Sequence, residues 1–258
     1  MNLLQGIILG IVEGFTEFLP ISSTAHLVMT SRLMGLSQTD YLKSFEIIIQ
    51  LGAILAVVVS YWKRLWQWEI IKRLVVAFIP TGVLGLLFYK IIKQVLIGNF
   101  SVMLWALLLG GVLLIVFEKT YKMDRAEPGD LAKIPYKTCI WIGLFQSIAM
   151  IPGVSRSAAT IVGGMILGVQ KKTIVEFSFL LAVPTMLAAT GLDLVKNAGS
   201  FSSDQALLLS VGFVMSFLMA LLGIKFLLAA LQKKSFSAFG WYRIAVASLF
   251  FVLLSQGL

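Results

Sequence analysis

Residues 13–26 read EGFTEFLPISSTAH, and residues 152–160 read PGVSRSAAT. Apolar runs flank both stretches and are long enough to enter a lipid bilayer. Ionisable side chains cost free energy in such places, so they mark a functional site by default. The first stretch carries two carboxylates, several hydroxyls and the only histidine, and the second carries an arginine between two serines. Together they predict a site for an anionic phosphate group that also holds catalytic side chains.

The composition is that of an integral membrane protein. Of the 258 residues, 59% are hydrophobic and 13% are charged, whereas soluble domains average about 45–50% apolar and about 25% charged residues. The length suits one bundle, so we predict a single integral membrane domain over residues 1–258. The net charge is +9, but the basic residues gather in short loops between apolar runs. This pattern indicates topology signals and contacts with anionic membrane lipids, and it disfavours nucleic acid as a partner.

Six apolar runs are long enough to cross the hydrocarbon core, which takes about 20 helical residues. They lie near residues 44–62, 74–90, 101–118, 174–193, 207–231 and 240–257. Two further apolar stretches, residues 3–35 and 137–170, are broken midway by Pro20 and by Pro152-Gly153. Because each half is too short to span, we expect two re-entrant helix–turn–helix units that dip into the membrane and return. The predicted fold is an all-α polytopic membrane protein with six transmembrane helices and two re-entrant units.

The distribution of basic residues indicates the topology. With residues 63–73 in the cytoplasm, cytoplasmic loops hold 14 basic residues and the other side holds 5. The cytoplasmic set is Lys63, Arg64, Lys72, Arg73, Lys119, Lys122, Arg125, Lys133, Lys137, Lys171, Lys172, Lys225, Lys233 and Lys234, and the opposite set is Arg32, Lys43, Lys90, Lys93 and Lys196. Arg243 is interpreted as a charge at the cytoplasmic start of the last span. Both termini then lie outside, and the two re-entrant units enter from opposite faces.

Entry from opposite faces suggests an inverted repeat, and the sequence hints at one. Residues 18–23 (FLPISS) parallel residues 150–157 (MIPGVSRS), and the prolines of the two segments are 132 residues apart. We therefore predict a first repeat over about residues 1–118 and a second over about residues 137–258. Inverted repeats whose broken helices meet at the membrane midplane are typical of transporters.

The carboxylates of the first stretch are Glu13 and Glu17. They are four residues apart, so on a helix they share one face. Their neighbours are apolar, which argues against the alternative of two residues that solvate a surface helix. Paired carboxylates that face a cavity can bind a divalent metal ion or act as an acid/base pair.

The hydroxyls of the first stretch are Ser22, Ser23 and Thr24, which follow the chain turn at Pro20. One of them is expected to cap the next helix. The N-terminus of that helix would aim free N–H groups at the cavity and so form a phosphate site. His26 is one turn into the helix, within reach of Ser22 or Ser23, and we interpret it as catalytic rather than as a hydrogen-bonded core residue.

The second stretch supplies the complementary cation. Gly153 allows a tight turn, and Ser155 or Ser157 can cap the following helix. Arg156 offers a planar, charged guanidinium suited to a phosphate. We favour this role over the alternative of a structural arginine that donates to unpaired backbone carbonyls at the turn. Thr160 adds one more hydroxyl on the same helix.

Three further polar residues stand near the ends of predicted spans. These are Glu46, Gln50 and Glu176. The sequence alone does not decide whether they line the cavity or reach the membrane interface.

The motif Glu13-Gly-x-x-Glu17-Phe-Leu-Pro-x-Ser-Ser-Thr-x-His26 and the motif Pro152-Gly-x-Ser-Arg-Ser-x-x-Thr160 resemble the two signatures of the undecaprenyl-diphosphate phosphatase family of the bacitracin-resistance type. Residues 45–52 and 176–184 are also similar to that family. The resemblance implies hydrolysis of a C55 polyprenyl diphosphate to its monophosphate, which recycles the lipid carrier of peptidoglycan synthesis. It also implies the bacterial inner membrane, a site that faces the periplasm, and dependence on a divalent cation such as Mg²⁺ or Ca²⁺.

The resemblance gives functional weight to Glu13, Glu17, Ser23, His26, Ser155 and Arg156. From motif and resemblance together, we predict these roles. The catalytic residues are Glu17, Ser23, His26 and Arg156; the phosphate-binding residues are Ser22, Thr24, Ser155, Arg156, Ser157 and Thr160; the metal ligands are Glu13 and Glu17.

Several alternatives stay open at this point. We favour Ser23 as the nucleophile, activated by His26 or Glu17, over direct attack by His26 or by water. The rival function is transport of a lipid phosphate by the same residues, and a weaker one is a binding-only chaperone for the lipid carrier. The sequence alone does not indicate the oligomeric state, and a homodimer is one candidate.

Overall fold

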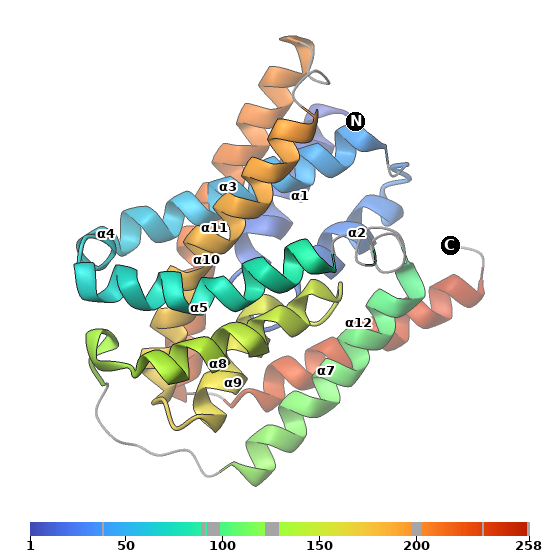
Figure 1. Ribbon diagram of the computed structural model, residues 1–258. Coiled ribbons are helices and arrows are strands. Elements are labelled where there is room, and N and C mark those ends of the chain that lie inside the picture. Colours follow the sequence, from blue (N-terminus) through green and yellow to red (C-terminus); the bar gives the residue numbers. More distant parts are fainter. Residues whose placement is uncertain are drawn as a thin grey trace.

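The computed structural model describes residues 1–37, 39–88, 91, 99–121, 129–197, 203–233 and 235–256. Within these ranges every regular element is a helix (Figure 1). Six helices are long and apolar enough to cross a membrane. They are α3 (Asp40–Ser60), α5 (Trp68–Leu87), α7 (Phe100–Thr120), α10 (Lys171–Asn197), α11 (Ser203–Lys233) and α12 (Ser237–Ser255). The prediction of an all-α polytopic membrane protein with six spanning helices is confirmed.

The largest difference between a predicted and an observed boundary lies at the start of α5. The apolar run predicts a start at residue 74, but the helix begins at Trp68. Its first turns are charged and are stabilised locally, because Glu69 accepts hydrogen bonds from Lys72 at 2.6 Å and from Arg73 at 2.9 Å. Such pairs, three and four residues apart, support a helix without adding hydropathy. The short helix α4 (Trp62–Leu65) joins α3 to α5.

The two predicted helix–turn–helix units are present as broken helix pairs. The first consists of α1 (Leu3–Thr16) and α2 (Ser23–Leu33), and the second of α8 (Tyr136–Ser147), the 3₁₀ turn η3 (Ile148–Met150) and α9 (Arg156–Ile166). Their α-helices are 11 to 14 residues long, and crossing the hydrocarbon core takes about 20. Re-entry of these units into the membrane stays a prediction.

The two turns share one unusual backbone conformation. Ser22 has φ 69° and Ser155 has φ 76°, and among the described residues they are the only ones other than glycine with positive φ. Each caps its helix, since Ser22 Oγ accepts from the N–H of Ala25 and Ser155 Oγ accepts from the N–H of Ala158. A strained residue of this kind persists only where its surroundings hold it. The expected hydroxyl caps are therefore Ser22 and Ser155, which are 133 residues apart.

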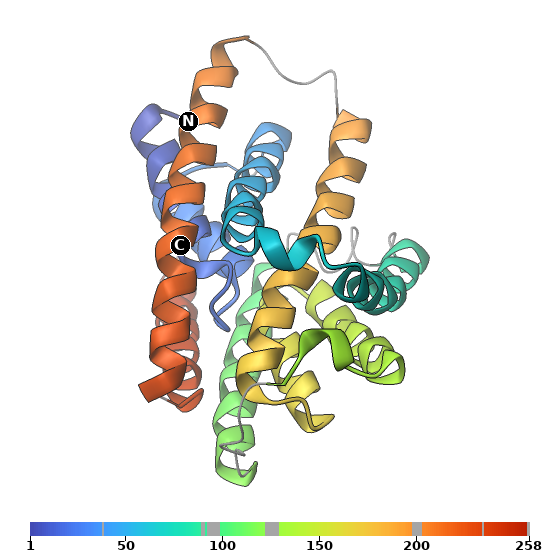
Figure 2. The same cartoon turned by 90° about the vertical axis from the view of Figure 1, so that its left-hand side faces the viewer.

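The helices of the two halves interleave. Helix α1 packs on α11 and α8 packs on α5, while α3 contacts α11 and α5 contacts α10. Figures 1 and 2 show α5 crossing α10 rather than running alongside it. Glycine allows the closest approaches: a Cβ at Gly14 would overlap the carbonyl of Ser216 on α11, and one at Gly143 would overlap the carbonyl of Ala77 on α5. These contacts form matched pairs, but the inverted repeat with its boundaries at 1–118 and 137–258 stays a prediction.

The first turn lies in the protein core. Phe18, Leu19 and Ile21 are buried in the main hydrophobic cluster, which also contains Ala158 and Ile161 of α9. Buried apolar side chains of the first turn therefore pack in the same cluster as those of α9 and help to fix the two turns relative to each other.

Arg243 corrects one sequence interpretation. It is not a charge at the membrane interface at the start of the last span, because it is almost two turns into α12 and its side chain is fully buried. Its guanidinium donates to backbone carbonyls of α7 and of both turns. Hydropathy along the chain cannot distinguish an interfacial arginine from one that is buried by the packing of distant segments.

Thiol labelling tests the predicted topology. Thr39 lies between α2 and α3, Gln67 lies between α4 and α5, and both side chains are exposed. A membrane-impermeant thiol reagent should label Thr39→Cys in intact spheroplasts and should label Gln67→Cys only after lysis. The unmodified protein is the control, since its one cysteine, Cys139, is buried. Labelling of Gln67→Cys but not Thr39→Cys in intact spheroplasts would contradict the topology.

Candidate active site

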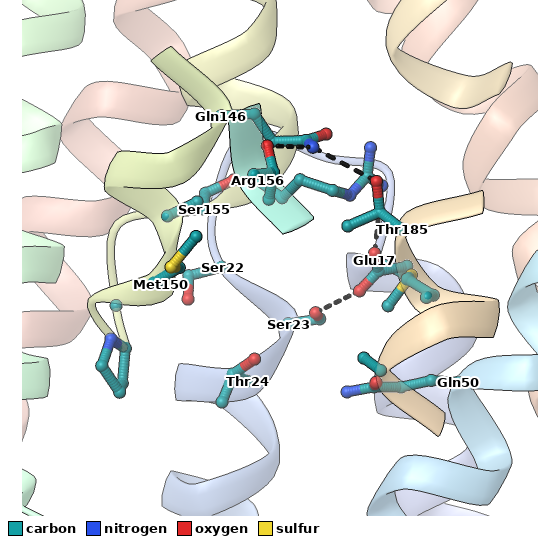
Figure 3. Close-up of a pocket in the computed structure, with 16 residues that line it drawn as sticks. Glu17, Ser22, Ser23, Thr24, Gln50, Gln146, Met150, Ser155, Arg156 and Thr185 are labelled. Carbon is teal, nitrogen blue, oxygen red and sulfur yellow. Dashed lines mark hydrogen bonds and ion pairs between the residues drawn. The ribbon is translucent and has the colours of Figure 1, made fainter. Parts of the chain in front are cut away.

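A cavity of roughly 200 Å³ lies where the two turns meet (Figure 3). Its motif residues come from both broken helix pairs. They are Glu17, Ser22, Ser23, Thr24, Pro152, Gly153, Ser155 and Arg156. The structure thus brings two sequence motifs, more than 120 residues apart, to one cavity.

Glu17 joins the two motifs. Its Oε2 accepts a hydrogen bond of 2.5 Å from Ser23 Oγ, and its Oε1 accepts one of 3.0 Å from Arg156 Nη2. Figure 3 shows both side chains approaching the same carboxylate. Only 6% of Glu17 is exposed, so its charge requires such partners. One carboxylate therefore positions a hydroxyl from the first turn and a guanidinium from the second.

Arg156 is anchored but keeps free donor capacity. Its Nη1 donates to the carbonyl of Ser178 on α10 at 2.8 Å, and Nη2 donates to Glu17. Its buried Nε has no partner among the described residues. Because a guanidinium has five N–H donors in one plane, donors remain for an anion in the cavity.

Ser23 and Arg156 hold equivalent positions in their turns. Each is the first residue of a helix and directly follows a capping serine with positive φ. Both reach Glu17 from these positions. The N-termini of α2 and α9 therefore converge on one cavity, and their dipoles favour a negatively charged ligand there.

Two residues predicted to bind phosphate are used inside the protein instead. Ser157 Oγ donates to the carbonyl of Leu19 at 2.8 Å, which ties the second turn to the first. Thr160 Oγ1 donates to the carbonyl of Arg156, one turn back in α9. Both side chains are buried and neither lines the cavity. Their positions in the structure offer no support for phosphate binding. The sequence could not show this, because spacing alone does not distinguish a helix face toward the core from one toward a cavity.

His26 is held behind the cavity wall. Its Nδ1 lies 2.8 Å from the carbonyl of Ser22, and its Nε2 lies 2.8 Å from the hydroxyl of Tyr242. In the neutral ring, Nδ1–H donates to the carbonyl and Nε2 accepts from the tyrosine. Tyr242 also stacks on the imidazole at 5.5 Å between ring centroids. Of the two bases that the sequence offers for Ser23, the structure places Glu17 on its hydroxyl.

Glu13 lies one turn before Glu17 in α1 and is fully buried. Neither of its carboxylate oxygens has a hydrogen-bond partner among the described residues. In the part of the chain that the structure describes, no three His, Cys, Asp or Glu side chains form a metal-binding group. Glu13 does not line the cavity, whereas Glu17 does.

The open question about three polar residues is partly resolved. Gln50 lines the cavity. Glu176 does not, and it forms an ion pair of 3.2 Å with Arg64 beside the short helix α4. Glu46 is absent from the cavity lining, although its Oε1 is buried without a partner.

Sequence reasoning missed a further polar group in the cavity lining. Gln146 Nε2 donates to Thr81 Oγ1 at 2.9 Å and to Thr185 Oγ1 at 3.2 Å, and all three line the cavity. A signal was available, because Thr81 and Thr185 each directly follow a proline inside a spanning helix. The residues come from α5, α8 and α10, and only the fold brings them together.

Comparison with known proteins identifies the family. The model of the family described as bacitracin resistance protein BacA matches residues 6–249. The chain belongs to this family. An undecaprenyl-diphosphatase of Aquifex aeolicus is 52% identical over 247 residues, covering 95% of this chain and 96% of the relative. Similar proteins of the same name occur in Bdellovibrio bacteriovorus, 45% identical over 100% of this chain and 98% of the relative, and in Methanococcus aeolicus, 44% identical over 98% and 100%.

Membership of the BacA family agrees with the geometry. The match covers both turns, five of the spanning helices, most of α12 and the cavity between the turns. The resemblance of the two motifs to this family is therefore confirmed over nearly the whole chain.

Proposed function

We propose that this protein hydrolyses undecaprenyl diphosphate to undecaprenyl phosphate and inorganic phosphate, and so recycles the lipid carrier of peptidoglycan synthesis. The observation that carries the proposal is the Glu17 carboxylate, which holds Ser23 and Arg156 together at a cavity between two helix N-termini. Relatives that share about half of the sequence are named for this hydrolysis. That naming favours hydrolysis over the alternative of lipid transport.

The contact between Ser23 and Glu17 supports a two-step displacement. Glu17 Oε2 takes the Ser23 hydroxyl proton while Ser23 Oγ bonds to the terminal phosphorus. The bond from that phosphorus to the bridging oxygen breaks, and undecaprenyl phosphate leaves with its electron pair. Glu17 then loses its proton to solvent, accepts another from an attacking water, and returns it to Ser23 Oγ as the phosphoserine bond breaks. Inorganic phosphate is released and the serine is regenerated.

Arg156 and the two helix N-termini supply positive potential. In phosphoryl transfer, negative charge spreads over the equatorial oxygens, and catalysis consists largely of positioning and electrostatic stabilisation. Arg156 is already fixed by Glu17 and Ser178, so its free donors are preorganised for those oxygens. His26 acts through the Ser22 carbonyl, whose turn it supports.

The cavity also offers apolar surface for the lipid part of the substrate. Its lining includes Ala149, Met150, Met186 and Ala189 beside the polar groups. A diphosphate attached to an isoprenoid chain presents both chemistries within a few bonds. The first isoprene units would contact these side chains, and the rest of the chain would lie among membrane lipids.

We place the protein in the bacterial inner membrane with the cavity open to the periplasm. The support is the excess of basic residues in the loops assigned to the cytoplasm, 14 against 5. A carrier lipid that has delivered its cargo outside would then be dephosphorylated on that side.

We further propose that a divalent cation, Mg²⁺ or Ca²⁺, binds at the carboxylate pair. The fit rests on Glu13, whose two buried oxygens lack partners and lie one turn from Glu17. Hard oxygen ligands of this kind suit both ions, and diphosphate oxygens and water would complete the coordination. When bound, the cation would neutralise charge on the phosphoryl group.

Phosphate release by the purified protein tests the function. Wild-type protein in detergent should release inorganic phosphate from undecaprenyl diphosphate, and Ser23→Ala should reduce kcat by about 10³-fold or more, because the nucleophile is lost. Ser210→Ala is the matched control, since Ser210 is exposed on α11 away from the cavity. The absence of release by wild-type protein would contradict hydrolysis and favour transport. A near-normal rate in Ser23→Ala would leave His26 or water as the nucleophile.

Chelation tests the cation. Exhaustive EDTA treatment should abolish phosphate release, and added Mg²⁺ or Ca²⁺ should restore it. Glu13→Gln should raise the cation concentration needed for half-maximal activity, because a charged ligand is replaced by a neutral one. Full activity after thorough chelation would mean that Glu13 and Glu17 act only in proton transfer.

A further inference from the structure

We propose that Arg243 is a positioning residue that locks the two turns of the active site to each other and to α7. The kinetic part of this inference rests on the proposed phosphohydrolase activity, whereas the structural part does not. Neither family motif contains Arg243, since it lies in the last helix, 87 residues after Arg156.

The hydrogen bonds of Arg243 reach three separate chain segments. Nε and Nη2 donate to α7, while Nη1 and Nη2 donate to the carbonyls of both turns. The acceptors are Leu107 at 3.0 Å, Ala106 at 3.1 Å, Pro20 at 3.3 Å, Val154 at 3.1 Å and Gly153 at 2.8 Å. All three guanidinium nitrogens are therefore used, and one side chain cross-links the breaks of both helix pairs.

The burial of Arg243 shows how much the fold depends on these bonds. The side chain is fully buried, and within the described residues no carboxylate forms an ion pair with it. A buried charge without a counter-ion is tolerated only when its donors are satisfied. Lysine could not replace it, because an ammonium has three donors around one atom and cannot span acceptors on three segments.

The clamp also orients backbone groups at the cavity. The peptide bond after Val154 is trans, so the N–H of Ser155 points opposite to the Val154 carbonyl that binds Arg243. That N–H is therefore directed away from the guanidinium, and Ser155 lines the cavity. The uncompensated charge of Arg243 stands directly behind both helix N-termini, where it adds to the potential that attracts a diphosphate.

Neighbouring residues confirm that the packing is built around this side chain. A Cβ at Gly110 of α7 would overlap the Arg243 guanidinium, so glycine leaves the space that it occupies. The preceding residue of α12, Tyr242, holds His26 of α2. Two successive residues of the last helix thus contact the first motif from behind.

The first experiment compares Arg243→Lys with Arg73→Lys. Arg73 is the matched control, because it is also buried and donates to the backbone, at Ile134 and Glu69, but none of its hydrogen bonds reaches either turn. Arg243→Lys should lower kcat for phosphate release about 10²-fold with a smaller change in KM, as expected when reacting groups are displaced. Arg73→Lys should stay within about twofold of wild type even if it is less stable.

Hydrogen exchange gives a readout that does not need activity. The amides of Ala25 and Ala158 are protected by the capping serines of the two turns. Arg243→Lys should speed the exchange of both together, while amides of α3 and α11 keep their wild-type rates. If Arg243→Lys speeds exchange at both turns but the wild-type protein releases no phosphate, the proposed function is contradicted and the clamp is supported. Unchanged exchange at the turns together with a normal kcat would overturn the clamp.

A second variant covers the case in which Arg243→Lys does not fold. Gly110→Ala leaves the arginine in place but pushes its guanidinium. It should reproduce the loss of kcat and the faster exchange at the turns. Gly191→Ala is the control, because a Cβ there meets nothing within 4 Å. Equal behaviour of the two glycine variants would contradict the proposal.

Discussion

The Glu17 carboxylate is buried among apolar helices and cannot remain charged there without partners. Its partners are Ser23 from the first turn and Arg156 from the second. The desolvation cost of one group is thus offset by bringing two distant motifs together. Because the same bonds hold a hydroxyl and a guanidinium at the cavity, the interaction that stabilises the site is also the one on which the proposed phosphoryl transfer depends.

The rest of the structure supplies what that interaction needs. Two helices are broken within the bundle, so their N-termini point at one cavity and their polar backbone groups face each other rather than lipid. Glycines at Gly14 and Gly143 let the broken helices approach spanning helices from the other half of the chain. Arg243 and Ser157 then tie the two turns directly, through backbone carbonyls. Each device acts on the relative position of the turns.

Much of this arrangement could be predicted from the sequence, and the failures have physical reasons. Hydropathy gives the six spans because a bilayer requires long apolar helices, and Pro20 reveals the first break. A carboxylate within an apolar run of sequence indicates that Glu17 belongs to the functional site. Side-chain direction is not encoded in that way: the sequence places His26 within reach of Ser22 or Ser23, and the structure shows it bonded to the Ser22 carbonyl and to Tyr242. Contacts between distant segments depend on the tertiary packing: the prolines before Thr81 and Thr185 mark two partners of Gln146, but no pattern along the chain pairs them with it or places Arg243 against both turns.

A double-mutant cycle between Glu17→Gln and Arg156→Lys tests the central claim most directly, with kcat/KM for phosphate release as the readout. Glutamine keeps the shape of Glu17 but loses its charge, and lysine keeps the charge of Arg156 but loses its planar fork. If one carboxylate holds the guanidinium in its working position, the arginine substitution should cost much less in the Glu17→Gln background, with a coupling of about 1–3 kcal/mol. Losses that add to within about 0.5 kcal/mol would show two independent residues and would contradict the account.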